Sequence, residues 1–507
     1  MIQVLSRRKQ KKMIAKEQMK EFWQTLVIFT VIVFGILTIF GTLTSGLHMV
    51  DDHEFIRFTT EFEEDGISMV ELIKQENARD GVTRFRPLYY PIRIIQTLLF
   101  GTNLFAMSVG KGIEVVLTCM LVYYVARKLN CSKKYAFITT AIVLSGPQAA
   151  VCWKLGTPEL TATWIFALAI LWILKWKETR KIRYHVGVFG CMVFDILYKE
   201  NYVLLIPCIM LLYLYFDLEN KDITWLNIWN AIKSNLGIEI ILAVLVILDL
   251  LCILMGAGIN GPGYVGFDSN MTLWFYIKMF LNNFRLHLRI GQYGFFVLAL
   301  LIVFRKNMTE IVNKLKWEIL LTFAIILPQM IMFSKTGLEE RYVIPWIYGV
   351  AYFFVIVLSQ QTWLTGKMRT YYGVFLGMLV GVNLILTCYE ASYFTYRGKG
   401  IERMFDEVMK IADSETKILS AYAPYDESDK TTSYWFHKRG IDEVYVYRDG
   451  ECTDWYREGK GEKISIDEVD IILTYNFNDR HFVEEPDIDF SDFEFYEYNT
   501  MRVAVRK

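Results

Sequence analysis

The chain has 507 residues, of which 54% are hydrophobic and 15% aromatic, and its 54 basic side chains balance 54 acidic ones. Soluble globular proteins are only about 45–50% apolar even with glycine counted, so this composition excludes an ordinary soluble protein. The balanced charge gives no support to nucleic-acid binding, and the eight scattered cysteines lack the spacing of a zinc site or a disulfide framework.

The N-terminal residues 1–22 are rich in lysine and arginine, and an apolar run from about Trp23 to Leu43 follows them. Roughly 20 helical residues, each rising about 1.5 Å, cross the ~30 Å hydrocarbon core of a bilayer. The positive-inside rule therefore predicts a first span with a cytoplasmic N-terminus. The run is too long for a cleaved signal peptide, and no small-residue cleavage site follows it.

Hydropathy predicts about eleven spans in total. The later ten lie near residues 106–128, 135–153, 159–176, 184–197, 202–216, 236–256, 292–304, 317–333, 342–360 and 371–393. Alternating sides place three basic loops in the cytoplasm, and an odd number of spans exports the C-terminus. The fifth and sixth runs are short, and one span more or fewer would invert everything after them.

The spans group into a transmembrane domain over residues 23–396, with an outer loop at 44–105. In that loop, residues 62–76 and 88–100 have the pattern of helices lying on the membrane surface. Residues 397–507 turn soluble and acidic, which predicts a small α/β domain outside the membrane. Its expected elements are a helix over 401–413 and strands near 418–423, 444–448, 469–475, 493–498 and 502–505.

An acidic and imidazole cluster, Asp51-Asp52-His53-Glu54, follows the first span and falls on the outer face. Adjacent carboxylates repel, which raises one pKa, while a nearby cation lowers the other. Such a pair can hold an ionised general base, which a hydroxyl acceptor needs in order to lose its proton. A solvated loop or a helix N-cap, where Asp is common, explains the same residues equally well.

Three further polar motifs fall on the same face. Arg84 and Arg86, before Pro87, offer forked donors to a phosphate, or anchor the chain at the headgroups. Lys199-Glu200 interrupts two apolar segments, and charges at that depth indicate a cavity unless they neutralise each other in a turn. Arg341-Tyr342 precedes a late span and is either a phosphate ligand or a helix-capping arginine.

These motifs, taken in order, resemble the type-C (GT-C) glycosyltransferases, integral-membrane enzymes that use polyprenyl-phosphate sugars. Their first outer loop carries an acidic pair, as Asp51-Asp52 does here. The O-mannosyltransferases with tetratricopeptide tails have an Arg-Pro-Leu stretch and a Lys-Glu turn, which Arg86-Pro87-Leu88 and Lys199-Glu200 resemble. Bacterial members often show an Arg-Tyr near a late span, as Arg341-Tyr342 does. The resemblance covers roughly the first two thirds of the chain.

The resemblance implies a polytopic α-helical plasma-membrane enzyme that moves a monosaccharide, with inversion, from a polyprenyl-phosphate donor to a cell-envelope glycan, lipid or protein. Asp51 or Asp52 would be the general base. The residues implied for the donor phosphate are Arg84, Arg86, Lys199, Arg341 and Tyr342, and those for orienting groups or binding the acceptor are His53, Glu54 and Glu200. We expect no metal and no cofactor. The C-terminus lacks tetratricopeptide repeats, so a protein acceptor is not specifically implied.

Three alternatives stay open. A transporter or flippase of lipid-linked sugars would use the same cations but would need no base. A glycan polymerase or ligase with a diphosphate-linked donor would rely on arginines in a late outer loop, and residues 257–291 end in Arg285, His287 and Arg289. A non-catalytic membrane scaffold would leave the charges at membrane depth unexplained.

Overall fold

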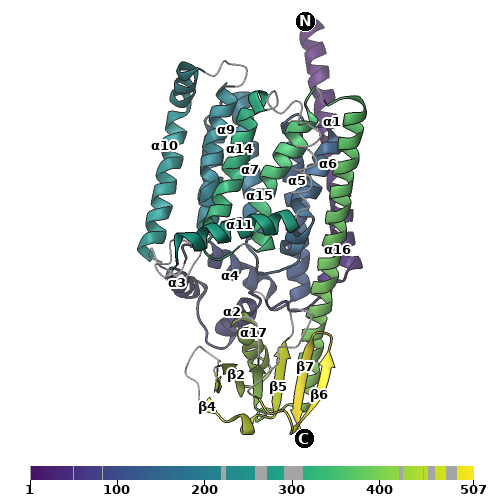
Figure 1. Ribbon diagram of the computed structural model, residues 1–507, viewed down its shortest axis with the longest axis vertical. Helices are drawn as coiled ribbons and strands as arrows, with labels where there is room; N and C mark the ends of the chain where they lie inside the picture. Colours follow the sequence, from purple (N-terminus) through teal and green to yellow (C-terminus); the bar gives the residue numbers. More distant parts are fainter. Residues whose placement is uncertain are drawn as a thin grey trace.

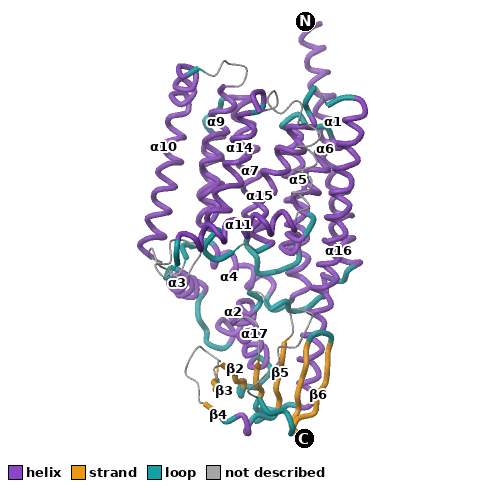
Figure 2. The backbone as a smooth tube through the Cα atoms, in the orientation of Figure 1, coloured by secondary structure: helices purple, strands orange, loops and turns teal. Residues whose placement is uncertain are grey.

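The computed structural model describes residues 2–49, 51–82, 84–218, 224–256, 271–290, 312–337, 339–362, 364–421, 426–448, 450–454, 463–475 and 488–507. Long, roughly parallel helices form a bundle, and a sheet domain lies beyond one end of it (Figures 1 and 2). The N-terminus lies at the end of the bundle away from the sheet, and the C-terminus lies in the sheet domain. The predicted class, a helical multi-pass membrane protein with a C-terminal strand-containing domain, is confirmed.

Seven helices among the described residues are long and apolar enough to cross a bilayer. They comprise α1 (Ile2–Ile39), α5 (Leu104–Lys128), α7 (Glu159–Thr179), η3 with α9 (Glu200–Leu205 and Ile206–Leu218), α10 (Trp225–Gly256), η5 with α15 and η6 (Glu340–Val343, Ile344–Ala351 and Tyr352–Val357) and α16 (Gly366–Ile411). Each overlaps one of the predicted spans.

Of the other four predicted spans, three are described, and these do not reach that length. They form the shorter helices α6 (Lys133–Leu144), α8 (Arg183–Tyr198) and α14 (Lys316–Met332). The fourth run, at 292–304, lies outside the described residues. Helix α6 ends early because Gly146 takes a φ of 106° and Pro147 opens the 3₁₀ helix η2 (Pro147–Cys152). The total of eleven spans therefore stays a prediction.

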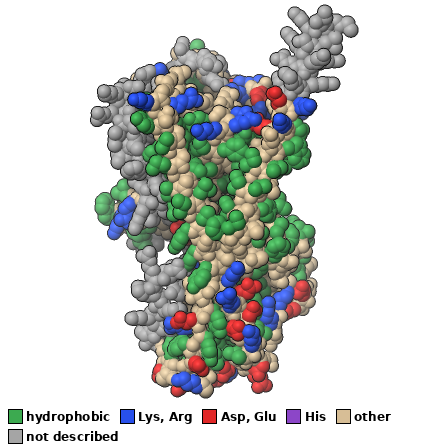
Figure 3. Space-filling view, turned by 90° about the vertical axis from the view of Figure 1, so that its right-hand side faces the viewer, with side chains coloured by type: hydrophobic (Ala, Val, Ile, Leu, Met, Phe, Trp, Pro, Cys, Tyr) green, Lys and Arg blue, Asp and Glu red, His purple; other side chains and the backbone are tan. Residues whose placement is uncertain are grey.

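The distribution of charge agrees with a bilayer around the bundle. In Figure 3, lysines and arginines gather at the upper end, and acidic and basic side chains mix around the sheet domain. A broad band of hydrophobic side chains with few charges separates these two regions on the face shown. Helices α1 and α16 of this side carry exposed large hydrophobic residues such as Val31 and Ile385, and α10 carries Ile247.

The outer loop forms three short helices between α1 and α5. They are α2 (His53–Glu63), α3 (Met69–Asp80) and α4 (Tyr89–Phe100). The prediction of one helix over 62–76 is wrong, because the chain turns at Gly66, with a φ of 63°, and Ser68 caps a new helix by accepting the N–H of Glu71. The helix predicted over 88–100 is confirmed as α4. Within the predicted loop 257–291, α11 (Leu273–Ile290) is helical.

The C-terminal domain contains a seven-stranded sheet in the order β4-β3-β2-β1-β5-β7-β6. Its strands are β1 (Ile418–Ala421), β2 (Val444–Arg448), β3 (Glu451–Asp454), β4 (Lys463–Ile464), β5 (Ile471–Tyr475), β6 (Phe493–Tyr498) and β7 (Met501–Arg506). β1 pairs in parallel with β2 and β5, whereas β7 runs antiparallel between β5 and β6. All five predicted strands are present, and β3 and β4 add two short ones.

One continuous helix joins the membrane bundle to this domain. The predicted last span and the predicted helix 401–413 are parts of α16, so the domain boundary expected at residue 397 falls inside a helix. The end of α16 and α17 (Asp426–His437) share a hydrophobic core with β1 and β5. Lys438, just after α17, binds Glu63 of α2 at 2.8 Å, so the domain also contacts the outer loop.

Candidate active site

The chain between η1 (Thr42–Thr44) and α2 folds into a tight turn around the carboxylate of Asp52. Oδ2 of Asp52 accepts the backbone N–H groups of His48 at 2.5 Å and Met49 at 3.1 Å, and Arg397 of α16 donates to the carbonyl of His48 at 2.6 Å. Burial raises the pKa of Asp52 to about 6, although the N–H of His48 opposes this shift. Asp52 occupies the N-cap position of α2 without capping it; its carboxylate holds the preceding turn.

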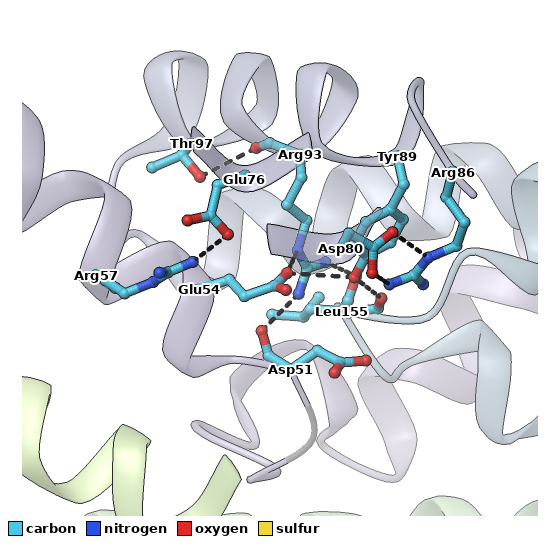
Figure 4. A network of polar contacts seen from close by, with 11 residues as sticks. Asp51, Glu54, Arg57, Glu76, Asp80, Arg86, Tyr89, Arg93, Thr97 and Leu155 are labelled. Carbon is cyan, nitrogen blue, oxygen red and sulfur yellow. Dashed lines mark hydrogen bonds and ion pairs between the residues drawn. The ribbon is translucent and has the colours of Figure 1, made fainter. Parts of the chain in front are cut away.

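Asp51 differs from its neighbour in both backbone and surroundings. Its φ is 57°, the left-handed conformation, and its carbonyl accepts a hydrogen bond from Arg93 at 2.6 Å. Its side chain is half-buried and makes no hydrogen bond or ion pair with any residue that the structure describes. Figure 4 shows this carboxylate turned away from the pair formed by Glu54 and Arg93. Asp51 is therefore the acid of the pair that is open to a ligand.

Arg93 of α4 is the central residue of the network in Figure 4. Besides Asp51, its guanidinium donates to Glu54 at 2.6 Å and to the carbonyl of Leu155 at 3.1 Å, and it lies 3.9 Å from the centre of the Phe55 ring. Tyr89 also donates to Glu54, at 3.2 Å. The sequence interpretation missed Arg93, although a lone arginine in an otherwise apolar helix is a known sign of a buried partner.

The predicted phosphate ligand Arg86 is held by a carboxylate of α3. Nε and Nη2 of Arg86 donate to Oδ2 and Oδ1 of Asp80 at 3.0 and 2.8 Å, and its guanidinium lies 4.3 Å from the centre of the Tyr89 ring. A second arginine of the loop, Arg57, pairs with Glu76 at 2.6 Å. These two buried pairs fasten α3 to α2 and to the start of α4.

Arg84, Arg86 and Glu200 lie near one another, since the carboxylate of Glu200 interacts electrostatically with both arginines. His53 is buried at the start of α2, and its Nδ1 has no hydrogen-bond partner among the described residues. Burial, followed by the charge of Arg57, keeps the pKa of His53 well below its ordinary value. His53 is therefore neutral at physiological pH.

Two of the predicted phosphate ligands, Lys199 and Arg341, contact the side chain of a third, Tyr342. Nζ of Lys199 lies 5.1 Å from the centre of the Tyr342 ring, and Nη2 of Arg341 donates to the Tyr342 hydroxyl at 3.1 Å. Phe333 stacks on the same ring at 4.7 Å. Lys199 also pairs with Glu159 at 3.1 Å, and both side chains are buried. Glu159, which the sequence interpretation took only as the start of a span, is thus part of this cation cluster.

The acidic turn and the cation cluster face the same region. Arg341 interacts electrostatically with Glu159 and with Asp51, and η5, which carries Arg341, packs against η2. Lys154, just after η2, interacts with Arg341 in the same way. The structure thus brings Asp51, Lys199, Arg341 and Tyr342 toward one site. Arg84 and Arg86 lie on the side of α3, and Glu200 interacts electrostatically with both Lys199 and these two arginines.

No group of three or more His, Cys, Asp or Glu side chains within the described ranges is arranged to hold a metal ion. Arg285 of α11, one of the late-loop cations, is exposed and donates to Asn282 at 2.8 Å. The side chains of His287 and Arg289 lie outside the described residues.

Residues 87–256 match the family model described as dolichyl-phosphate-mannose-protein mannosyltransferase. This segment, about a third of the chain, carries Arg93, Glu159 and Lys199. The match confirms the resemblance to the GT-C glycosyltransferases over these residues and supports a glycosyltransferase activity. No curated protein sequence matches the chain.

Two crystal structures of ArnT from Cupriavidus metallidurans are distantly similar in three dimensions. The structure bound to undecaprenyl phosphate has a TM-score of 0.46, and the apo structure has one of 0.48. Sequence identity is 12% for both, and each comparison covers 94% of this chain and 97% of the ArnT chain.

Proposed function

We propose that this chain is an integral-membrane glycosyltransferase that moves a monosaccharide from a polyprenyl-phosphate donor to a glycan, lipid or protein acceptor of the cell envelope. One observation carries the proposal. The carboxylate of Asp51, without a hydrogen bond or ion pair to any described residue, lies within electrostatic reach of Arg341. Arg341 in turn shares the Tyr342 ring with Lys199. An open base facing cations suits transfer from a lipid phosphate to a hydroxyl.

In the proposed reaction, Asp51 takes the proton of the acceptor hydroxyl while the oxygen of that group bonds to the anomeric carbon. The bond between this carbon and the donor phosphate oxygen breaks, and the lipid phosphate leaves with the electron pair. Lys199 and Arg341 offset the negative charge that grows on the leaving phosphate. Attack from the face opposite the phosphate inverts the configuration of the sugar.

Lys199 is suited to this role because its ammonium carries several N–H donors and can keep Glu159 as a partner while it binds a phosphate oxygen. Burying a charge without a partner costs several kcal/mol, so Glu159 keeps the lysine charged and in place before the donor arrives. Nε of Arg341 pairs with the exposed Glu339 at 2.8 Å, and its planar guanidinium carries further donors that match phosphate geometry.

We assign Asp52 to the structure of the turn, because its carboxylate faces the backbone N–H groups of His48 and Met49. Arg86 belongs by the same reasoning to the wall of the site, since Asp80 occupies its fork of donors. Glu54, held by Arg93 and Tyr89, is a positioning residue rather than an acceptor ligand.

We further propose that the N-terminus is cytoplasmic and that the site and the C-terminal domain face the exterior of the plasma membrane. Two observations support this sidedness. The two termini lie at opposite ends of the bundle, and lysines and arginines gather at the end opposite the sheet domain (Figures 1 and 3). A basic surface at one membrane boundary is typical of the cytoplasmic side.

The test is turnover by the purified full-length protein in lipid nanodiscs, with a panel of polyprenyl-phosphate monosaccharides and mass spectrometry of the released lipid phosphate. We expect one donor to be consumed. Asp51→Asn should lower turnover about 100- to 10,000-fold, the usual contribution of a general base. Asp52→Asn, the matched control, keeps an oxygen for His48 and Met49 and should stay within about tenfold of the parent, well short of that loss.

Failure of the folded protein to consume any donor would refute the enzymatic proposal. Full turnover by Asp51→Asn would refute the assignment of Asp51 as the general base. Sugar transport without transfer would favour the flippase alternative.

A further inference from the structure

An apolar groove follows four helices of the membrane bundle and has a volume of about 300 Å³. Its walls come from α1, α5, α6 and α16, and nearly every side chain that lines it is hydrophobic. Ile32 and Leu384 stand where the groove opens outward, with exposed fractions of 48% and 38%. These helices belong to the hydrophobic band in Figure 3, so the opening faces the hydrocarbon of the bilayer.

One end of the groove reaches a pair of cations. Trp153, which follows η2, lines this end, and its ring lies 6.3 Å from the ring of Phe394 on α16. Nζ of Lys154 lies 4.7 Å from the centre of the same Phe394 ring, and Cζ of Arg397 lies 4.8 Å from it. A single aromatic ring therefore separates the end of an apolar groove from two positive charges.

Carboxylates offset the charge at this end only in part. Lys154 is half-buried and makes no hydrogen bond or ion pair with any described residue. Burial, and then the charges of Arg341 and Arg397, lower its pKa to about 8. Glu339 and Glu340, which attract it, are exposed to solvent. Glu390 of α16 is half-buried and interacts electrostatically with both Lys154 and Arg397. Cations gathered this closely and partly desolvated form a site that an anion would stabilise.

We infer that this groove holds the first isoprene units of the donor's polyprenyl tail and that Lys154 binds the phosphate where the tail leaves the groove beside Arg341. The inference rests on the proposed function and adds to it a route for the lipid and a phosphate ligand. A cavity of roughly 150 Å³ holds one benzene molecule, so the groove has room for about two groups of that size. The remaining tail passes through the opening between Ile32 and Leu384 into the bilayer.

The groove fixes position rather than supplying hydrophobic affinity. A polyprenyl tail is already in hydrocarbon, and lipid tails are as apolar as leucine, so no transfer from water contributes. What the groove adds is packing of the methyl-branched chain against α1 and α16, which sets the depth of the phosphate relative to Lys199 and Asp51. A bulky side chain in the groove should therefore affect long-chain phosphates and spare short ones.

The test compares Leu384→Trp with Ile385→Trp, the same change at neighbouring positions of α16. Leu384 lines the groove, whereas Ile385, 69% exposed, faces the lipid. Binding to the full-length protein in nanodiscs is measured for a long-chain polyprenyl phosphate and for citronellyl phosphate, neither of which carries a sugar. We expect Leu384→Trp to weaken long-chain binding at least tenfold and to leave citronellyl phosphate unchanged, with no effect of Ile385→Trp. Lys154→Met should weaken both ligands.

Cross-linking provides a second measurement that does not depend on these variants binding well. A benzoyl-phenylalanine at position 384 should capture a radiolabelled polyprenyl phosphate, and one at 385 should capture bulk phospholipid. Equal behaviour of the two tryptophan variants, or phospholipid at position 384 that excess polyprenyl phosphate does not displace, would overturn the inference. Groove binding without turnover of any donor would instead refute only the transferase proposal, whereas normal turnover without capture at 384 would refute only the groove.

Discussion

Replacing Arg93 by methionine should separate two roles that its guanidinium combines. One role is electrostatic, because Arg93 neutralises the buried carboxylate of Glu54 at 2.6 Å. The other is positional, because it donates to the carbonyl of Asp51 at 2.6 Å and fixes the proposed base. A double-mutant cycle with Glu54→Gln distinguishes the two roles. The double variant removes both charges of the pair, but it does not restore the hydrogen bond to the carbonyl of Asp51.

The expected sizes follow from these contacts. Removing one partner of a buried ion pair costs about 3–5 kcal/mol, whereas replacing both partners by neutral groups is often nearly neutral. The hydrogen bond from a charged group to the Asp51 carbonyl contributes about 1.5–3 kcal/mol. It opposes a left-handed backbone that costs about 1–2 kcal/mol at a non-glycine residue. At 1.36 kcal/mol per factor of ten, its loss lowers the population of the productive turn about 10- to 100-fold.

Arg93→Met should therefore lose stability and about 10- to 100-fold in kcat/KM, whereas Glu54→Gln/Arg93→Met should regain most of the stability and little of the activity. Stability is measured by thermal unfolding in detergent, and activity by donor turnover. A double variant that regains both would show that Arg93 acts only through Glu54. A folded Arg93→Met variant with full turnover would refute the positioning of Asp51 by this arginine.

Three other outcomes are expected. Gly398→Ala should lower stability and turnover together, because a Cβ there would overlap the Ser45 carbonyl oxygen, whereas Gly377→Ala on the same helix has open space and should be at least as stable as the parent in thermal unfolding. Burial raises the pKa of Asp52 to about 6, whereas its value in the unfolded chain is near 4. The free energy of unfolding should therefore be highest below pH 4 and should fall by about 3 kcal/mol as the pH rises through 6. Thermal unfolding midpoints measured between pH 4 and 8 should show this loss in the parent and not in Asp52→Asn. Lys199→Met should raise the donor KM and destabilise the protein, and adding Glu159→Gln should restore only the unfolding temperature.

Much of the fold could be predicted because the signals are local. Apolar runs long enough for a bilayer identify their own helices, and short strand-like runs identified the strands of the C-terminal domain. The end of the last transmembrane helix could not be predicted. The change from apolar to polar residues at Tyr393–Arg397 marks the membrane surface, but it does not break a helix. α16 continues through it to Ile411. Hydropathy indicates whether a segment lies in lipid or in water. It does not indicate where a helix ends, because polar residues maintain the backbone hydrogen bonds of a helix equally well.

The sequence predicted which charged residues belong to the candidate site, but only partly which of them form ion pairs or hydrogen bonds with one another. Asp51 and Lys199 stood out because charges beside apolar spans are costly. Their partners did not, because Arg93 and Glu159 lie about 40 residues away in the chain from the groups they hold. Arg86 was assigned to phosphate although its partner Asp80 is close in sequence. An arginine with two well-placed carboxylate contacts is indistinguishable, as a motif, from one that awaits a phosphate.

α16 connects the apolar groove, the turn of the acidic pair and the C-terminal domain, and this restricts how these parts can move. Along about 30 Å of one helix, Leu384 lines the apolar groove, Arg397 binds the turn of the acidic pair, Gly398 packs against that turn, and Phe405 enters the core of the C-terminal domain. A turn of the helix by one residue rotates its side chains by about 100° and would break all four contacts. The position of the C-terminal domain is therefore mechanically coupled to the geometry of Asp51. An acceptor that shifts the domain would act on the base through this helix, without touching the carboxylate itself.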